Sequence, residues 1–341
     1  MQSGIRDSRG GFARYYRSDS QQNLPVSNEI TGYAVSALLY LHRSLPPGEL
    51  RESCLHAALE TARYLTREAW DAGSATFPFE PSSPKVYFFD TGIIARGLLA
   101  AWKQTGDREF YSRARDASLS MAFDFLGDGE IYPVISLPDK QPLSYEASWS
   151  REPGCYQTKS ALAWLGVGEE SGRRMFDTVL ASALATHEAF LDAVPEPEKL
   201  MDRLHPYCYF LEALLAVADR ADCRAALASG IDRVGTLLRR ISPQFERSDV
   251  GAQLLRVRLI AHHLNVIQLN EEAACDEADR AASFQFHGDD PRSLGGFGFG
   301  LKRGAMMPFV NPVSAVFCLQ ALNLWHQHRA GEWDFEFWQL I

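Results

Sequence analysis

Residues 30–41 read ITGYAVSALLYL, a predicted helix with apolar side chains around nearly its whole circumference. A helix of this kind must be buried on every side. The segment 210–217, FLEALLAV, has the same character. Residues 51–70 differ, because their apolar positions follow the i, i+3, i+4, i+7 spacing of a helix with one apolar face. These positions are Cys54, Leu55, Ala58, Leu59, Ala62 and Leu65. The chain therefore contains two kinds of helix, one enclosed and one half-exposed.

The two kinds of helix alternate along the chain. Enclosed helices are predicted to begin near residues 28, 88, 155, 204, 249 and 312, and amphipathic helices near residues 51, 107, 170, 221 and 271. Such a succession of helix pairs is typical of a repeat architecture. An open solenoid would leave each helix one exposed face, which the enclosed helices do not have. The pattern therefore predicts an all-α toroid of the (α/α)6 type, with about six helical hairpins arranged in an inner and an outer ring. We expect residues 1–341 to form one domain.

Helix caps support these boundaries. Ser27-Asn28 and Ser248-Asp249 provide side chains that accept hydrogen bonds from the first turn of a helix. His205-Pro206 and Asn311-Pro312 each place a polar residue before a proline, which suits the first helical position. Two long connections, residues 73–86 and 127–154, are rich in Pro, Gly, Ser and aromatic residues, and connections of that length are usually functional or mobile.

Composition excludes several classes of protein. The 341 residues are 46% hydrophobic and carry 34 Lys and Arg against 43 Asp and Glu, a formal charge of −9. An acidic chain without a basic run is a poor partner for nucleic acid or an anionic membrane. No apolar stretch approaches the ~18 residues that a transmembrane helix needs. The start of the sequence lacks the apolar region of a secretory signal, and the six cysteines form no CxxC motif. We therefore expect a cytoplasmic protein with reduced thiols and no membrane span.

Four segments carry a resemblance to known proteins. NEITGY at 28–33, FFDTGIIARGLL at 88–99, LHPYCYFLEALL at 204–215 and GGFGFG at 295–300 resemble the α/α-toroid superfamily. That superfamily includes six-hairpin glycosidases, uronate lyases and epimerases, and the terpenoid cyclase and prenyltransferase toroids. The segments are most similar to an uncharacterised toroid family associated with polysaccharide biosynthesis genes. The resemblance implies the fold and a saccharide ligand.

The sequence departs from the motifs that define three toroid chemistries. Asp289-Asp290 is followed by Pro-Arg-Ser and so does not complete the DDxxD metal motif of class I terpene synthases. The DxDD motif of class II cyclases and the Cys-His-Gly zinc motif of lanthionine cyclases are also missing. His262 and His263 are adjacent, so on a helix their side chains point about 100° apart. We therefore predict neither a metal site nor a cofactor.

Candidate catalytic residues lie where the inner helices begin, because these ends meet at one mouth of a toroid. His205, Tyr209 and Glu212 share one face of an otherwise apolar helix, where an imidazole, a phenol and a carboxylate can hold shifted pKa values for proton transfer. Glu29 and Asp90 form a candidate carboxylate pair. We expect His205, Tyr209, Glu29 and Asp90 to be catalytic, whereas Glu212 lies deeper and favours a structural role.

Further polar and aromatic residues are candidates for substrate binding. Helix N-termini offer free N–H groups, and aromatic faces stack on sugar rings. The candidates are Tyr156, Gln157, Tyr207, Asp249, Gln253 and Asn311 at the helix ends, and Phe79 and Trp149 in the long connections. Capping is the alternative for Asp90, Asp249 and Asn311. Arg96 and Arg256 lie in apolar runs, so we expect each to pair with an acid, or else to bind a substrate carboxylate.

These features predict a carbohydrate-active enzyme that acts on a poly- or oligosaccharide. Proton transfer at a uronic acid, as in an epimerase or lyase, is favoured over glycoside hydrolysis, which needs an acid and a base or nucleophile at a set separation. Two alternatives remain open. The first is a non-catalytic saccharide-binding or scaffold protein of a polysaccharide pathway. The second is a prenyl- or terpenoid-processing toroid. The sequence does not specify the sugar, the bond or the oligomeric state.

Overall fold

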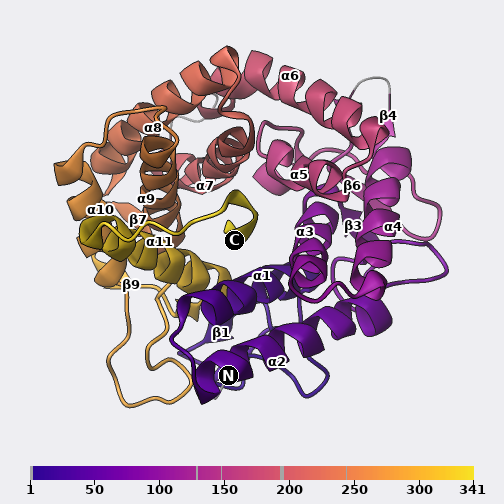
Figure 1. Cartoon of the computed structure of the whole chain (residues 1–341), viewed down its shortest axis with the longest axis horizontal. Helices are drawn as coiled ribbons and strands as arrows, with labels where there is room; N and C mark the ends of the chain where they lie inside the picture. Colours follow the sequence, from indigo (N-terminus) through magenta and orange to yellow (C-terminus); the bar gives the residue numbers. More distant parts are fainter. Residues whose placement is uncertain (1–2, 128–129, 147, 193–195, 243) are drawn as a thin grey trace.

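A computed structural model describes residues 3–127, 130–146, 148–192, 196–242 and 244–341. Its helices form two concentric rings around a central axis (Figure 1). The inner ring consists of α1 (Asn28–Ser44), α3 (Phe88–Thr105), α5 (Gln157–Val167), α7 (Pro197–Leu214), α9 (Ser248–His263) and α11 (Pro312–Ala330). The outer ring consists of α2 (Glu49–Tyr64), α4 (Arg108–Asp124), α6 (Glu170–Asp192), α8 (Ala221–Ile241) and α10 (Glu271–Ala282). The predicted all-α toroid is confirmed.

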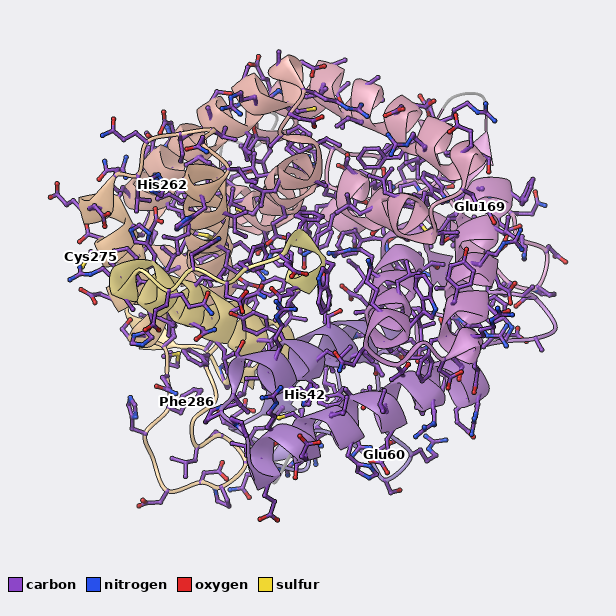
Figure 2. The ribbon with its side chains drawn as sticks, viewed as in Figure 1. His42, Glu60, Glu169, His262, Cys275 and Phe286 are labelled. Carbon is purple, nitrogen blue, oxygen red and sulfur yellow. The ribbon has the colours of Figure 1, made fainter. Side chains whose placement is uncertain are left out.

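The two rings differ in burial as the sequence predicted. Most residues of α3 and α9 are buried, whereas α10 buries only Ala274, Ala278 and Ala281, which lie along one face. Side chains fill the space enclosed by the inner helices, while Glu60, Glu169 and Cys275 lie on the outside of the ring (Figure 2). The hydrophobic core is thus a closed band between and within the two rings.

Short strands border the starts of the inner helices. β3 (Lys85–Tyr87) precedes α3 and pairs antiparallel with β6 (Val134–Ser136). β7 (Phe245–Arg247) precedes α9 in a sheet of order β7-β8-β9, with β8 (Gly300–Lys302) and β9 (Ala305–Met306). β10 (Phe309–Val310) precedes α11 in the order β10-β1-β2, with β1 (Tyr16–Arg17) and β2 (Gln22–Asn23). The Tyr16↔Val310 register joins the two ends of the ring. β4 (Leu126–Gly127) pairs with β5 (Glu130–Ile131).

Two of the predicted caps are confirmed, and one predicted boundary is wrong. Ser27 Oγ accepts from the N–H of Ile30 at 3.3 Å, and Asn311 Oδ1 accepts from the N–H of Val313 at 2.9 Å. Helix α7, however, begins at Pro197 rather than near residue 204, so Pro206 lies inside the helix. The reason is that Leu200, Met201 and Leu204 already pack into the core, which holds the preceding turns in helical form.

Helices α1, α3 and α5 approach one another closely at glycines. A Cβ added to Gly92 would lie 2.4 Å from the Cβ of Ser160, and one added to Gly97 would lie 2.5 Å from the carbonyl oxygen of Gly32. No side chain fits at such distances. The first three inner helices therefore pack backbone to backbone.

The chain beyond α11 turns into the ring instead of forming a sixth outer helix. Trp333 stacks on His263 with ring centroids 3.7 Å apart, and a 3-10 turn follows at Phe337–Gln339. Leu340 and Ile341 are each only 1% exposed, and the end of the chain lies at the centre of the ring (Figure 1). Residues 331–341, which we call the tail, therefore contribute to the axial core. None of the described helices is both long and apolar enough to cross a bilayer.

Candidate functional site

His205 is held at its Nδ1 atom by neighbours from helix α9. Nδ1 lies 2.7 Å from Oε1 of Gln253 and 3.5 Å from Oδ2 of Asp249. The Nε2 group of Gln253 points to Oε1 of Glu212 at 3.5 Å, so its carbonyl faces the imidazole. Because that carbonyl oxygen can only accept, Nδ1 carries the proton, and in the neutral ring Nε2 has a free lone pair.

The protonation state of His205 follows from its surroundings. Burial lowers the pKa of His205 to about 4, although Asp249 acts in the opposite direction. Arg247 donates to both carboxylate oxygens of Asp249, at 3.0 and 2.7 Å, and so neutralises much of that opposing charge. The ring is therefore neutral near pH 7, which a general base requires.

Glu29 and Asp90 form an interacting carboxyl pair on the first turns of α1 and α3. Burial raises the pKa of Glu29 to about 7. Burial and the neighbouring Glu29 carboxylate raise the pKa of Asp90 well above its usual range. Asp90 is 6% exposed, and its Oδ2 has no hydrogen-bond partner among the described residues. Asp90 is thus not a helix cap but a buried acid with a raised pKa, next to a carboxyl whose pKa is about 7.

Two stacked tyrosines connect His205 with Glu29. Tyr209 lies one turn below His205 on α7, with ring centroids 4.6 Å apart, and Tyr33 lies one turn below Glu29 on α1. The rings of Tyr33 and Tyr209 are stacked at 6.4 Å, both almost fully buried. Helices α1 and α7 lie on opposite sides of the ring (Figure 1), and the Tyr33–Tyr209 stack joins them one turn below Glu29 and His205.

A buried charged cluster lies beneath the floor. The ammonium group of Lys159 lies 4.6 Å from the centre of the Tyr209 ring and donates to Glu212. Arg256 also donates to Glu212, and all three side chains are fully buried. Burial lowers the pKa of Lys159 to about 7. Burial alone would raise the pKa of Glu212, but the charges of Lys159 and Arg256 outweigh that effect and lower it. The structural role expected of Glu212 is consistent with this arrangement.

Aromatic side chains stand beside His205. The ring of Trp149 is 6.0 Å from that of His205 and 5.2 Å from that of Tyr156. Trp149 is partly exposed, whereas Tyr156 is fully buried and its hydroxyl donates to the carbonyl of Glu152 at 3.0 Å. Trp149 therefore keeps part of its surface accessible beside His205, whereas the neighbouring Tyr156 is enclosed.

Several predicted binding residues lie elsewhere. Tyr207 points away from His205, as expected two positions along a helix, and its hydroxyl meets Nδ1 of His187 at 3.0 Å. Gln157 faces a hollow between α5 and α6, where its Oε1 accepts from Gly154 N–H at 3.2 Å. Asn311 caps α11. The expectation that these three line the central site is corrected. Phe79 lies under the guanidinium of Arg14, at 4.5 Å.

Three charged residues around the candidate site were not anticipated. Arg14 lowers the pKa of Glu29 and Asp90 against the effect of burial, and it pairs with Glu80. Lys159 completes the buried cluster around Glu212, and Arg247 completes the buried pair with Asp249. A lysine inside the apolar segment 158–167 is a signal that could have found Lys159, because an unpaired charge there would be costly. Arg256 pairs with Glu212 as expected.

Arg96 differs from the prediction that it pairs with an acid. Its Nη2 donates to the carbonyl of Leu340 at 2.9 Å, and no carboxylate among the described residues forms a salt bridge with it. The tail, which the periodicity did not place, supplies a backbone acceptor where we expected a carboxylate. Among the described residues no three His, Cys, Asp or Glu side chains are grouped to hold a metal ion.

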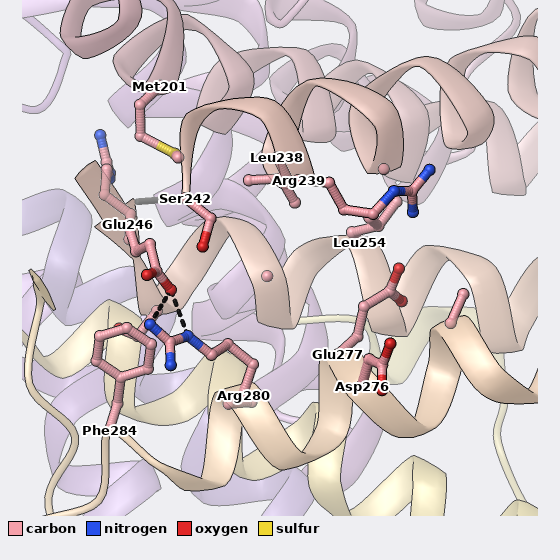
Figure 3. A pocket seen from close by; sticks show the side chains of 16 residues that line it. Met201, Leu238, Arg239, Ser242, Glu246, Leu254, Asp276, Glu277, Arg280 and Phe284 are labelled. Atoms are coloured by element: carbon pink, nitrogen blue, oxygen red, sulfur yellow. Dashed lines mark hydrogen bonds and ion pairs between the residues drawn. The ribbon is translucent and has the colours of Figure 1, made fainter. Parts of the chain in front are cut away.

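A separate hollow of about 240 Å³ lies between α8, α9 and α10 (Figure 3). Its base is apolar, with Leu238, Leu254 and Phe284, and an Arg280–Glu246 pair stands at one side. Arg247 reaches its wall, but His205, Glu29 and Asp90 do not line it. This hollow therefore lies outside the central site.

The structure is similar to solved structures of sugar-processing enzymes. The cellobiose 2-epimerase of Spirochaeta thermophila matches with a TM-score of 0.72 at 12% identity, over 96% of this chain and 93% of that chain. A D-mannose isomerase matches at 0.66 and 11%, over 95% and 93%. A family 76 α-mannanase of Bacteroides thetaiotaomicron matches at 0.60 and 10%, over 96% and 94%. The fold is that of the six-hairpin glycosidase-like α/α toroids.

These structures confirm the toroid fold that the resemblance of the four sequence segments implied. No protein-family model matches the sequence, and no curated protein matches it either. At identities of 10–12% the similarity to the three structures defines the fold alone. The chemistry of the toroid has to be argued from its own residues.

Proposed function

We propose that the chain is a carbohydrate-active enzyme that removes a proton from the carbon next to the carbonyl of a reducing sugar and returns it. The observation that carries this proposal is the state of His205. Its Nδ1–H donates a hydrogen bond to Gln253, and its ring is neutral at pH 7. Its Nε2 makes no hydrogen bond within the described parts of the chain. A neutral imidazole with one free nitrogen is a general base.

Glu29 supplies the complementary acid in this proposal. With a pKa of about 7, it is partly protonated near neutrality and can deliver its proton to the carbon that His205 has deprotonated, after which exchange with solvent removes the proton from His205 and restores it to Glu29. Return of a proton to the same carbon from the opposite face inverts that centre. Return to the neighbouring carbon moves the carbonyl instead. The position of Glu29 across the axis from His205 favours the first outcome, an epimerisation.

The charge of the site favours a neutral sugar over the uronate that the sequence suggested. Two carboxyl groups, Glu29 and Asp90, stand on one side, and ionised Glu29 would repel a substrate carboxylate. Arg14, the cation nearest this pair, is engaged by Glu80. The names of two structural neighbours contain the sugars cellobiose and mannose, and both sugars are neutral. Trp149 offers an aromatic face for the sugar ring.

Glycoside hydrolysis is the second candidate, favoured by the Glu29–Asp90 pair itself. Hydrolysis needs one protonated carboxyl and one that can act as base or nucleophile. Asp90 suits the first role, and Glu29 above its pKa suits the second. In this case His205 would bind substrate instead of taking a proton. The α-mannanase neighbour is consistent with this alternative.

Proton NMR in D₂O separates these possibilities. The protein is incubated with neutral reducing sugars, including cellobiose and mannose, with uronic acids, and with oligosaccharides. Loss of the signal of the proton beside the carbonyl supports the proposal, and new reducing ends support hydrolysis. His205→Gln should abolish the exchange, whereas Tyr207→Phe, on the opposite face of the same helix, should retain it. Sugar binding without exchange or cleavage would overturn the proposal in favour of a non-catalytic saccharide-binding protein.

A further inference from the structure

A continuous series of polar contacts joins His205 to the tail. At the upper end, Gln253 accepts from Nδ1 of His205 at 2.7 Å and directs its own NH₂ group to Glu212 at 3.5 Å. Glu212 in turn accepts from Arg256. Arg256 reaches the tail at its lower end, where its Nη1 donates to the main-chain oxygen of Ile341 at 3.3 Å. We call His205, Gln253, Glu212, Arg256 and the main chain of Ile341 the axial series.

The tail is fixed to the lower end by several further contacts. Lys159 donates to the oxygen of Ile341 at 2.9 Å while it also donates to Glu212. Gln320 accepts from Arg256 at 2.8 Å and from the N–H of Ile341 at 3.2 Å, and it donates to the carbonyl of Gln339 at 2.8 Å. The tail therefore supplies both a donor and acceptors to the helices that surround it.

Because these contacts are buried, the loss of one of them affects the others. The side chains of Lys159, Glu212, Arg256 and Gln253 are fully excluded from solvent. In such surroundings a charged group that loses a partner must find another or admit water. If the tail leaves, Arg256 and Lys159 both lose the main-chain oxygen of Ile341 as an acceptor, while Glu212 still accepts from each of them. Glu212 then shifts, and so does the amide of Gln253 that determines which nitrogen of His205 carries the proton.

We propose that residues Gln339–Ile341 are a positioning element for His205, acting through Arg256, Glu212 and Gln253. Within the part of the chain that the structure describes, the tail forms no hydrogen bond with the imidazole itself. Its role is to keep the proton of His205 on Nδ1, so that Nε2 stays free. The effect on catalysis rests on the function proposed above, whereas the effect on the imidazole does not depend on it.

The state of His205 can be read directly in the protein without substrate. In ¹⁵N-histidine-labelled full-length protein, two-bond ¹⁵N–¹H correlations distinguish the Nδ1–H from the Nε2–H form, and a pH titration gives the pKa. The His205 signals are those missing from His205→Gln. The charged groups that face the ring are Asp249 on α9, Arg247 on β7 and Glu212 on α7, and none of them is altered by the variants below.

Two variants disturb the tail in different ways. The first lacks residues 339–341. The second, Gln320→Leu, keeps the full chain but loses the contacts of Gln320 to Gln339, Ile341 and Arg256. Glu332→Gln is the matched control, because this residue lies in the tail with an exposed side chain. Circular dichroism and thermal melting establish whether each variant is folded.

In the folded tail variants we expect His205 to populate both ring forms. We also expect its pKa to rise by about one unit or more towards its ordinary value, because water enters the axis. Where turnover is measurable, kcat should fall about tenfold with little change in KM, as expected when a binding surface is intact but a base is misplaced. Glu332→Gln should match the parent protein.

An unchanged tautomer and pKa for His205 in a folded tail variant would overturn the proposal. If the deletion does not fold, Gln320→Leu decides alone. If the parent protein turns over no sugar, the NMR result still decides the role of the tail. If sugar is turned over and the NMR spectra of the variants are unchanged, the tail proposal fails while the proposed function stands.

Discussion

Nδ1 of His205 lies 2.7 Å from the amide oxygen of Gln253, and this single contact determines which nitrogen of the ring is free. Replacing Gln253 with Leu removes the acceptor while leaving Asp249 at 3.5 Å as a poorer one. We expect kcat to fall about 10- to 100-fold, the range seen when groups that orient a functional histidine are lost. Steady-state kinetics on the sugar found by NMR provides the measurement. Activity equal to that of the parent protein would show that Gln253 does not orient the base.

Glu29 should make the protein less stable at high pH. Its pKa of about 7 lies above the 4.5 of an exposed glutamate, so between these values the folded state holds more protons than the unfolded state. Stability contributed by this group is therefore present at low pH and lost as pH rises through 7. We expect Glu29→Gln to be more stable than the parent protein by about 1–3 kcal/mol at pH 8 but not at pH 4.5. Urea unfolding at both pH values tests this, and equal gains at both would contradict it.

The same carboxyl predicts the alkaline limit of activity. Turnover in our proposal requires neutral His205, with a pKa of about 4, and protonated Glu29, with a pKa of about 7. The pH profile of kcat/KM should therefore fall as pH rises through about 7. Glu29→Gln keeps a donor but cannot return a proton, so epimerisation should be lost although the variant is more stable. A profile that instead rises above pH 7 would favour hydrolysis with Glu29 as base.

Glu212 should be far more important for stability than an exposed carboxylate. It compensates two fully buried cations, Lys159 and Arg256. Removing one partner of such a cluster leaves an uncompensated charge, so Glu212→Gln should cost about 3–5 kcal/mol. Glu109→Gln is the control, because Glu109 pairs with Arg67 at the surface and should cost less than about 1 kcal/mol. Chemical denaturation of both variants measures the difference, and similar losses would refute it.

Gly92 and Gly251 both lie within inner helices but should respond oppositely to alanine. A methyl group at Gly92 would meet Ser160, whereas one at Gly251 would meet nothing within 4 Å. We expect Gly92→Ala to destabilise the protein by about 1–3 kcal/mol through overpacking. Gly251→Ala should stabilise it by about 0.5–1 kcal/mol through the better helix propensity of alanine. Thermal melts of the two variants should move in opposite directions.

Trp149 should contribute to sugar binding more than to the chemical step. Its partly exposed ring stands 6.0 Å from that of His205. Loss of a stacking surface of this kind should raise KM about tenfold in Trp149→Ala with a smaller effect on kcat. Trp102→Ala is a suitable control, because Trp102 is also partly exposed but packs on Tyr111 at the rim between α3 and α4. Equal kinetic effects in both variants would exclude a binding role for Trp149.

Hydrophobic periodicity was enough to predict the two rings. The apolar faces of 30–41 and 51–70 distinguish inner from outer helices, and the caps at Ser27 and Asn311 set two of the starts. The start of α7 was predicted wrongly. Proline is typical of the first turn of a helix, and the turns before Pro206 are partly polar, so the helix was expected to begin there. Whether residues 333–341 dock on the toroid or on a partner was left open by the sequence, because these nine residues have no helical period.

The candidate site was only partly predictable. Glu29, Asp90, Asp249 and Gln253 could be proposed because each lies in the first two turns of an inner helix, whereas His205 and Tyr209 lie within α7 and could be proposed because they share one face of an otherwise apolar segment. Tyr207, Gln157 and Asn311 share that position in sequence but point elsewhere, since the direction of a side chain depends on how its helix is rotated about its axis. Lys159 was missed because its partners Glu212 and Ile341 lie 53 and 182 residues away, and Arg247 because the importance of its bonds to Asp249 comes from the burial of both side chains.

The tail at the centre of the ring has a consequence for synthesis of the protein. Tyr40 receives a hydrogen bond from Asn323, 283 residues later, and Arg96 binds the carbonyl of Leu340, 244 residues later. Contacts of such sequence separation form late and slow the folding of a chain. While the last hairpin is still being translated, the axial core that encloses Lys159, Glu212 and Arg256 is incomplete. Until residues 331–341 have been synthesised, Lys159 and Arg256 therefore lack the main-chain oxygen of Ile341 as an acceptor.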